Sequence, residues 1–166
     1  MQRVVIYQIP ENEKVIYNLG QLLEQICIKE LKNKPNDRQK IGVLCKKEDL
    51  EVVDKALWTF STHTFVPHNI SCENKQQNIE QPILLSSNLE DIKDRNILCV
   101  FNGDGLKQVY SENSQQQIIY MTTENVIEEV KKICEVANIE IYKKQNGKWS
   151  KAEFWFDVKS GKNMYY

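Results

Sequence analysis

Residues 56–70 read ALWTFSTHTFVPHNI, a stretch in which an amphipathic helix meets a proline-containing loop. The stretch carries three aromatic residues, Trp58, Phe60 and Phe65, and both histidines of the chain. We expect the helix to end before Pro67, because proline cannot continue a helix and biases the preceding residue toward extended backbone. Large aromatic side chains either close a core over a helix end or anchor a docking protein. Both interpretations are open for Trp58 and Phe65.

Strand and helix patterns alternate before this stretch. A β-branched run at 4–9 predicts a first strand, and an apolar run at 41–45 predicts a second. Between them, residues 15–31 repeat apolar side chains at helical spacing. Residues 48–59 do the same, with acidic residues in the first turn, where the helix dipole favours negative charge. The first half of the chain therefore predicts a strand–helix–strand–helix order.

The second half of the chain continues with short strands. They are expected at 83–85, 97–101, 118–120 and 139–142, the last of them at a sheet edge. Residues 71–81 predict a polar surface loop, and residues 102–105 a plain turn. A third long helix is expected to begin at Thr122 or Thr123 and to stop at Asn138. This order predicts an α/β fold with a mainly parallel sheet.

Composition narrows the class of protein. The chain has 166 residues and a formal net charge of −1, so it has no global basic field for direct, non-specific nucleic-acid binding. The five cysteines are scattered without a metal-binding spacing, so we expect no metal site. No apolar run is long enough to span a membrane, and the first residues enter a strand without a signal-peptide pattern. A cytoplasmic protein is therefore expected.

No enzyme signature is present in the sequence. The turn after the first predicted strand lacks the glycines that a phosphate-binding loop needs. Residues 102–105 contain glycines, but their spacing is neither that of GxGxxG nor that of the P-loop. His63 and His68 have no accompanying nucleophile motif, and a loop histidine that fixes a turn by hydrogen bonding is the favoured role. We expect no cofactor and no catalytic residue. A small α/β enzyme or nucleotide-binding protein with an unrecognised motif is the alternative.

The helix ending in Leu57-Trp58, followed by Phe65-Val66-Pro67-His68 and then Asn69, resembles the signature of the chi subunit of bacterial DNA polymerase III. The order of predicted elements agrees with this family from about residue 3 to residue 150. The resemblance implies a Rossmann-like three-layer fold, with a mainly parallel sheet, helices on both faces and no nucleotide. It also implies a single domain over residues 1–152. Residues 153–166 then form an extension, interpreted as an edge strand or hairpin, or else as a peptide that docks on a partner.

The same resemblance implies a non-catalytic accessory role in DNA replication. Members of the family connect the psi subunit of the clamp loader to the C-terminal tail of single-stranded-DNA-binding protein. The residues implied to face psi, or a helicase competing for the same surface, are Trp58, Phe65, Val66, Pro67 and His68. A helicase-binding repair adaptor without psi would use this face as well, and is a further alternative.

The family receives the acidic, phenylalanine-ending tail of single-stranded-DNA-binding protein on its C-terminal helix. The residues implied here are Lys131, Lys132, Lys143 and Lys144. This chain departs from the family pattern, because it places Glu124, Glu128 and Glu129 near the same helix, and like charges weaken contact with an acidic tail. A solvated helix face followed by a basic segment is the simpler interpretation. The sequence leaves both open.

Overall fold

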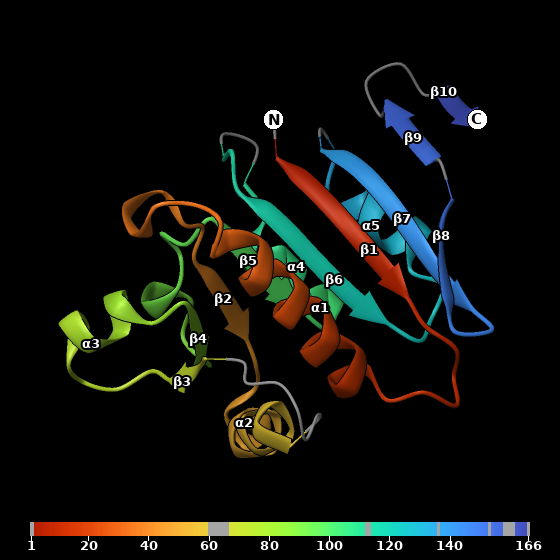
Figure 1. Ribbon diagram of the computed structural model, residues 1–166. Coiled ribbons are helices and arrows are strands. Elements are labelled where there is room, and N and C mark those ends of the chain that lie inside the picture. The colour runs from red at the N-terminus through yellow and green to blue at the C-terminus, as the bar shows by residue number, and fades with distance from the viewer. Residues whose placement is uncertain are drawn as a thin grey trace. The chain divides into compact units, whose positions relative to one another are not determined.

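The computed structural model describes residues 2–59, 67–111, 114–135 and 137–152, together with the backbone of residues 154–157 and 162–165. The fold is α/β, with a mostly parallel sheet of eight strands, and confirms the predicted Rossmann-like three-layer class. The chain divides into two compact units. Figure 1 labels their helices and strands. We call Lys14–Ile97 the central unit, and Met1–Glu13 together with Leu98–Tyr166 the terminal unit.

The central unit contains three parallel strands in the order β3-β4-β2. Its elements are α1 (Val15–Glu30), β2 (Ile41–Leu44), α2 (Leu50–Thr59), β3 (Asn69–Ile70), α3 (Lys75–Glu80) and β4 (Ile83–Ser86), with 3-10 turns at Pro35–Asp37, Lys47–Asp49 and Leu89–Asp91. All residues of β2 and β4 are buried, as expected of short apolar parallel strands. Leu19 and Leu23 of α1 and Val53 and Leu57 of α2 are buried as well, so each helix turns its predicted apolar stripe inward.

The terminal unit contains strands β6, β1 and β7 in parallel and β8 antiparallel to β7. Its elements are β1 (Arg3–Gln8), α4 (Gly103–Val109), β6 (Gln117–Thr122), α5 (Ile127–Ile133), β7 (Asn138–Gln145) and β8 (Lys148–Ala152), and β5 (Ile97–Val100) begins at the boundary of the two units. Helices α4 and α5 lie on one side of these strands (Figure 1). Asn146 and Gly147 both have positive φ, which gives β7 and β8 the tight hairpin turn predicted by an Asn-Gly pair.

Two segments predicted as irregular are helical. Residues 71–81 contain α3, because the Asn74 side chain accepts hydrogen bonds from the backbone N–H groups of Gln76 and Gln77 and so caps a helix that composition did not indicate. Residues 102–105 are the start of α4 rather than a plain turn. The Asn102 side chain accepts a hydrogen bond of 2.7 Å from the Gly105 N–H.

The prediction of a third long helix, beginning at Thr122 or Thr123 and stopping at Asn138, is wrong in the extent of the helix. Thr122 ends β6, and its hydroxyl accepts a hydrogen bond from the Glu124 N–H before any helix begins. α5 then covers only seven residues. The strand predicted at 139–142 is longer and is not an edge strand, because β7 lies between β1 and β8. Ile139 and Ile141 are both buried and alternate with partly exposed residues, so β7 buries one of its two faces.

Two strands are described within the extension, for which an edge strand or hairpin stays a prediction. β9 (Phe154–Asp157) pairs antiparallel with β10 (Lys162–Tyr165), and the two make a sheet of their own. A role in covering a sheet edge stays a prediction.

An ion pair joins the first strand to the seventh. The Arg3 guanidinium donates two hydrogen bonds to the Glu140 carboxylate, at 3.0 and 2.9 Å. These bonds hold the pKa of Glu140 below its usual range, and they raise the pKa of Arg3. A carboxylate whose pKa is lower in the folded state stabilises the fold above its unfolded pKa, and this contribution is lost as the pH falls through the folded pKa.

Glu140→Gln is therefore expected to lower the free energy of unfolding at pH 7 by up to about 1 kcal/mol, since Arg3 is partly exposed to solvent. The difference from the wild type should shrink as the pH falls through the lowered pKa of Glu140, because the wild-type carboxyl then becomes protonated in the folded protein as well. Urea unfolding at pH 7 and at pH 3 measures this. An equal difference at both pH values would show that the ion pair is not its cause.

Candidate partner-binding surfaces

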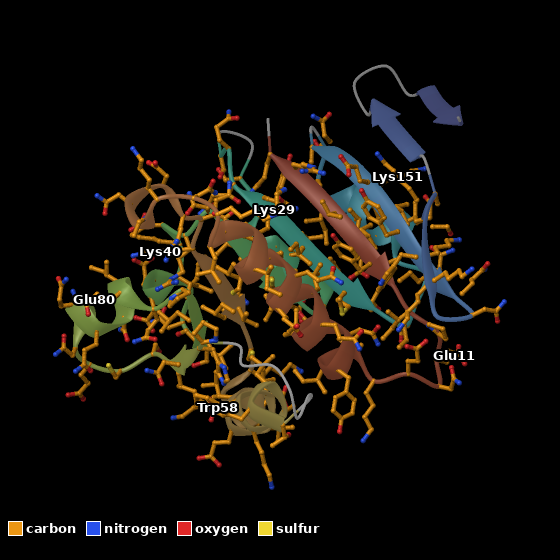
Figure 2. All side chains as sticks on the ribbon, in the orientation of Figure 1. Glu11, Lys29, Lys40, Trp58, Glu80 and Lys151 are labelled. Atoms are coloured by element: carbon orange, nitrogen blue, oxygen red, sulfur yellow. The ribbon has the colours of Figure 1, made fainter. Side chains whose placement is uncertain are left out.

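Trp58 lies near the C-terminal end of α2 and is 47% exposed, so it is not a core residue (Figure 2). The buried side of α2 is formed by Val53 and Leu57. Trp58 lies outside this buried side and is accessible to a partner. Tryptophan is among the residue types most enriched in interface hot spots.

His68 packs against the Trp58 ring. Its side chain is fully buried, with Nε2 3.0 Å from the Asp54 carboxylate and 3.2 Å from the Asp54 carbonyl oxygen. The imidazole packs against the indole at a centroid distance of 4.6 Å. The histidine is hydrogen-bonded, as the sequence favoured, but its described partner is Asp54 of α2 and not a group of its own turn. Because the ring is buried, any effect of His68 on a partner acts through the position of Trp58.

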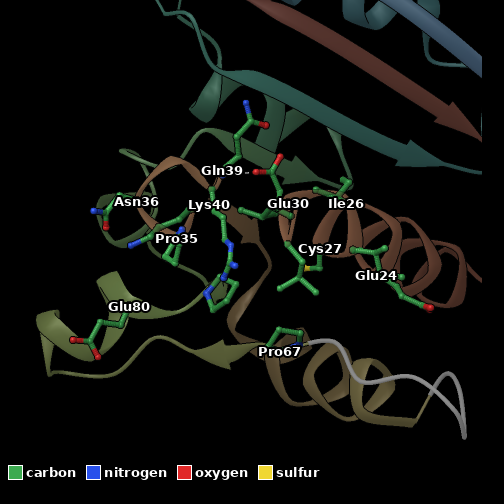
Figure 3. A pocket seen from close by; sticks show the side chains of 15 residues that line it. Glu24, Ile26, Cys27, Glu30, Pro35, Asn36, Gln39, Lys40, Pro67 and Glu80 are labelled. Atoms are coloured by element: carbon green, nitrogen blue, oxygen red, sulfur yellow. Dashed lines mark hydrogen bonds between the residues drawn. The ribbon is translucent and has the colours of Figure 1, made fainter. Parts of the chain in front are cut away.

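The rest of the motif is only partly described. Phe65 and Val66 lie outside the described residues. Pro67 is half-buried and lines a cavity of about 620 Å³ in the central unit. The cavity lies between the C-terminal half of α1, the loop at 35–40 and the segments around Pro67 and Glu80 (Figure 3).

Apolar and charged side chains both line the cavity. Cys27 of α1 and Leu31, which follows this helix, contribute to the lining, and burial raises the pKa of the Cys27 thiol to about 11, so the thiol stays neutral. Glu30 is held in place, because its carboxylate accepts a hydrogen bond of 2.9 Å from the Gln39 N–H (Figure 3). No pattern in the sequence brings these segments together, so the cavity could not be predicted from it.

The two lysines predicted on the C-terminal helix lie on α5. Lys132 is exposed, whereas the Lys131 ammonium lies 3.3 Å from the Glu128 carboxylate. Glu124 and Glu128 are exposed close by. The Glu129 carboxylate packs over Gly103 at the start of α4, an approach that a Cβ at position 103 would block. The positive charge offered by α5 is therefore small.

The two lysines on β7 point to opposite faces of the sheet, because neighbouring side chains on a strand alternate. Lys143 shares the face of the buried Ile141. Lys144 is on the other face, and its ammonium lies 2.7 Å from the Glu13 carboxylate with only 13% of the side chain exposed. The four lysines predicted for one tail-binding site are thus not brought together. Lys144 is separated from Lys143 by the sheet itself.

Lys144 instead belongs to a cluster that was not predicted from the sequence. We call it the aromatic face, and its residues are Tyr7, Tyr142, Trp149, Lys144 and Lys151. Tyr7 and Tyr142 stack at 5.3 Å, and Trp149 meets Tyr7 edge-on at 5.5 Å. Lys144 Nζ lies 5.9 Å from the Trp149 ring centroid. Tyr142 and Lys144 are two residues apart on β7, and Trp149 and Lys151 are two residues apart on β8. This spacing places the members of each pair on the same face of the sheet.

Membrane spans and metal clusters are both absent from the described part of the chain. No helix there is long and apolar enough to cross a membrane. No group of three or more histidine, cysteine, aspartate or glutamate side chains there is arranged to hold a metal ion.

Comparison with known proteins agrees with the motif and the fold. A family model described as "DNA polymerase III chi subunit, HolC" matches residues 1–148. No curated protein matches the chain. Because the matched residues cover most of the chain, including α2, Pro67 and His68, the chain belongs to the DNA polymerase III chi subunit family and has an accessory role in DNA replication.

Proposed function

We propose that this protein connects the psi subunit of the clamp loader to the C-terminal tail of single-stranded-DNA-binding protein. The observation that carries the proposal is the family match over residues 1–148, combined with the exposed Trp58 shortly before the Phe-Val-Pro-His segment. The protein acts by binding two partners.

Trp58 is the proposed anchor for psi. Its ring is exposed, but it packs against the buried His68, which Asp54 holds in turn, so little side-chain entropy is lost on binding. Pro67 extends this surface toward the cavity of the central unit. An apolar segment of psi that covers Trp58 and enters the cavity would leave the lining carboxylates in contact with water.

The residues proposed to bind the acidic tail lie on α5 and on β7. Lys132 and Lys143 are the cations that can meet carboxylates there, because Lys131 already faces Glu128 and Lys144 lies on the other side of the sheet. With so few cations and several exposed glutamates nearby, binding is expected to be weak and sensitive to salt.

Lys132→Glu is expected to weaken tail binding about tenfold at low salt, because it replaces an attraction by a repulsion. The test is calorimetric titration of the full chain with the last ten or so residues of the organism's own single-stranded-DNA-binding protein, at low and moderate salt. Lys29→Glu, an exposed lysine on α1 in the central unit, makes the same charge change and serves as the control.

Saturable binding that Lys132→Glu weakens and Lys29→Glu does not would support the proposed site. Equal losses in both variants would mean that only net charge matters. Absence of binding at either salt concentration would show that the glutamates near α5 have removed this function of the family.

A further inference from the structure

The aromatic face is an open, pre-positioned ring system. Trp149 is 41% exposed, yet it is fixed by its edge-on contact with Tyr7 and by the Lys144 ammonium, which Glu13 holds in turn. Tyr142 stacks on Tyr7 from the neighbouring strand. A flat ligand ring that lies on Trp149 therefore meets a surface that needs no rearrangement.

The phenol groups add no negative charge to this surface. Burial raises the pKa of Tyr7 to about 12, so its hydroxyl is protonated at any physiological pH. The Tyr142 hydroxyl lies 3.3 Å from the Glu140 carboxylate. Neither ring repels a phosphate.

The local charge is positive, although that of the whole chain is not. Three cations, Arg3, Lys144 and Lys151, and two carboxylates, Glu13 and Glu140, contact one another on this face, which gives it a net charge of +1. Lys143 and Lys148 are each next to a residue of the aromatic face along the strands and so point to the opposite face. Glu140 is shared by Arg3 at 2.9 Å and Lys151 at 4.0 Å, so two cations face one carboxylate. Because the whole chain has no basic field, the sequence predicted no direct nucleic-acid binding. The charge on this face differs from that of the whole chain.

The sequence is rich in aromatic residues from Trp149 onward. The family match ends at residue 148, one residue before Trp149. Residues 149–166 contain six of the fifteen aromatic residues of the chain, interleaved with three lysines. Aromatic residues interleaved with cations are the composition of surfaces on which bases stack while phosphates meet ammonium groups.

From these observations we infer that the aromatic face binds single-stranded nucleic acid directly, with a base stacked on Trp149 and phosphates contacting Lys151 and its neighbours. A single strand suits the surface better than a duplex, because the ring faces of paired bases are hidden in the stack. This contact goes beyond the bridging role and does not depend on it. It would place the protein on the strand itself as well as on the protein that coats it.

The test is a fluorescence anisotropy titration of labelled dT20 with the full chain at 50 and 200 mM salt. Trp149→Ala is expected to weaken binding about tenfold, which is the range for loss of one base–aromatic stack, while Trp149→Phe keeps most of the affinity. Lys151→Glu should weaken binding and make it less salt-dependent, by roughly 0.7 in the log–log slope for each phosphate that the variant no longer neutralises. A 20-base-pair duplex should bind more weakly than dT20.

Trp58→Ala is the matched control, because it removes an equally exposed tryptophan from the other unit and should leave dT20 binding unchanged. Circular dichroism establishes that each variant is folded. Absence of saturable binding at 50 mM salt would overturn the inference, as would equal losses in Trp149→Ala and Trp58→Ala. Binding of an acidic peptide in place of dT20, abolished in Trp149→Ala, would assign the face to a protein partner and overturn it as well.

Discussion

Trp58→Ala is expected to weaken binding of the psi subunit by about 30-fold or more, because loss of an interface hot spot costs about 2 kcal/mol or more. The expectation rests on an indole that is exposed and held by the buried His68 ring at 4.6 Å. The free energy of unfolding should fall by no more than about 1 kcal/mol, since the ring is not part of the core. Calorimetry with the purified psi subunit and urea unfolding measure the two quantities.

Val52→Ala is the matched control for this prediction. Val52 lies on the same helix and is 65% exposed, but it is six residues from Trp58 and so points in another direction. Its substitution should change neither binding nor stability. If Trp58→Ala lowered stability as much as binding, Trp58 would be a structural residue, and the proposed psi surface would have to be abandoned.

Arg95→Met is expected to destabilise the protein by about 3 kcal/mol, the usual cost of removing one partner from a buried charged network. Arg95 is buried in the central unit and donates hydrogen bonds to the carbonyl oxygens of Asn78, Gln81 and Ile41. Two of these carbonyls belong to the end of α3, where a positive charge also complements the helix dipole. Burial lowers the pKa of Arg95 to about 10, so the guanidinium is still charged at neutral pH.

Arg38→Met provides the comparison for Arg95→Met. Arg38 is only partly buried and its guanidinium donates a hydrogen bond to the Asn33 carbonyl oxygen at 3.2 Å, in an exposed position, so its substitution should cost less than about 0.5 kcal/mol. Urea unfolding of both variants tests the difference. Similar small losses in the two would mean that the carbonyls around Arg95 find other donors when the guanidinium is removed.

The sequence predicted those features that depend on local pattern. The runs that became β1, β2 and β4 contain mostly apolar residues, and such runs are buried in a parallel sheet whatever their neighbours are. The proline at 67 and the Leu-Trp helix end pointed to the family. The Asn146-Gly147 turn needed only the two residues that tolerate positive φ.

Features that depend on distant residues could not be predicted in this way. No sequence pattern predicted that Arg95 is buried, because a buried arginine can be identified only from the carbonyl groups that it contacts in the fold. The aromatic face needs Tyr7 beside Trp149, and these residues meet only after β1 and β8 take their places on either side of β7. The prediction that Lys143 and Lys144 act in one site did not take account of strand alternation, which places adjacent residues on opposite faces.

The most direct test of the proposed function is a surface plasmon resonance measurement on the immobilised tail peptide of single-stranded-DNA-binding protein at low salt. We expect the peptide to retain psi only after this protein has been added. We also expect that Trp58→Ala still binds the peptide but no longer retains psi, and that Lys132→Glu weakens retention of both. If the protein bound neither partner, or if psi displaced it from the peptide, it would not be the bridge proposed here.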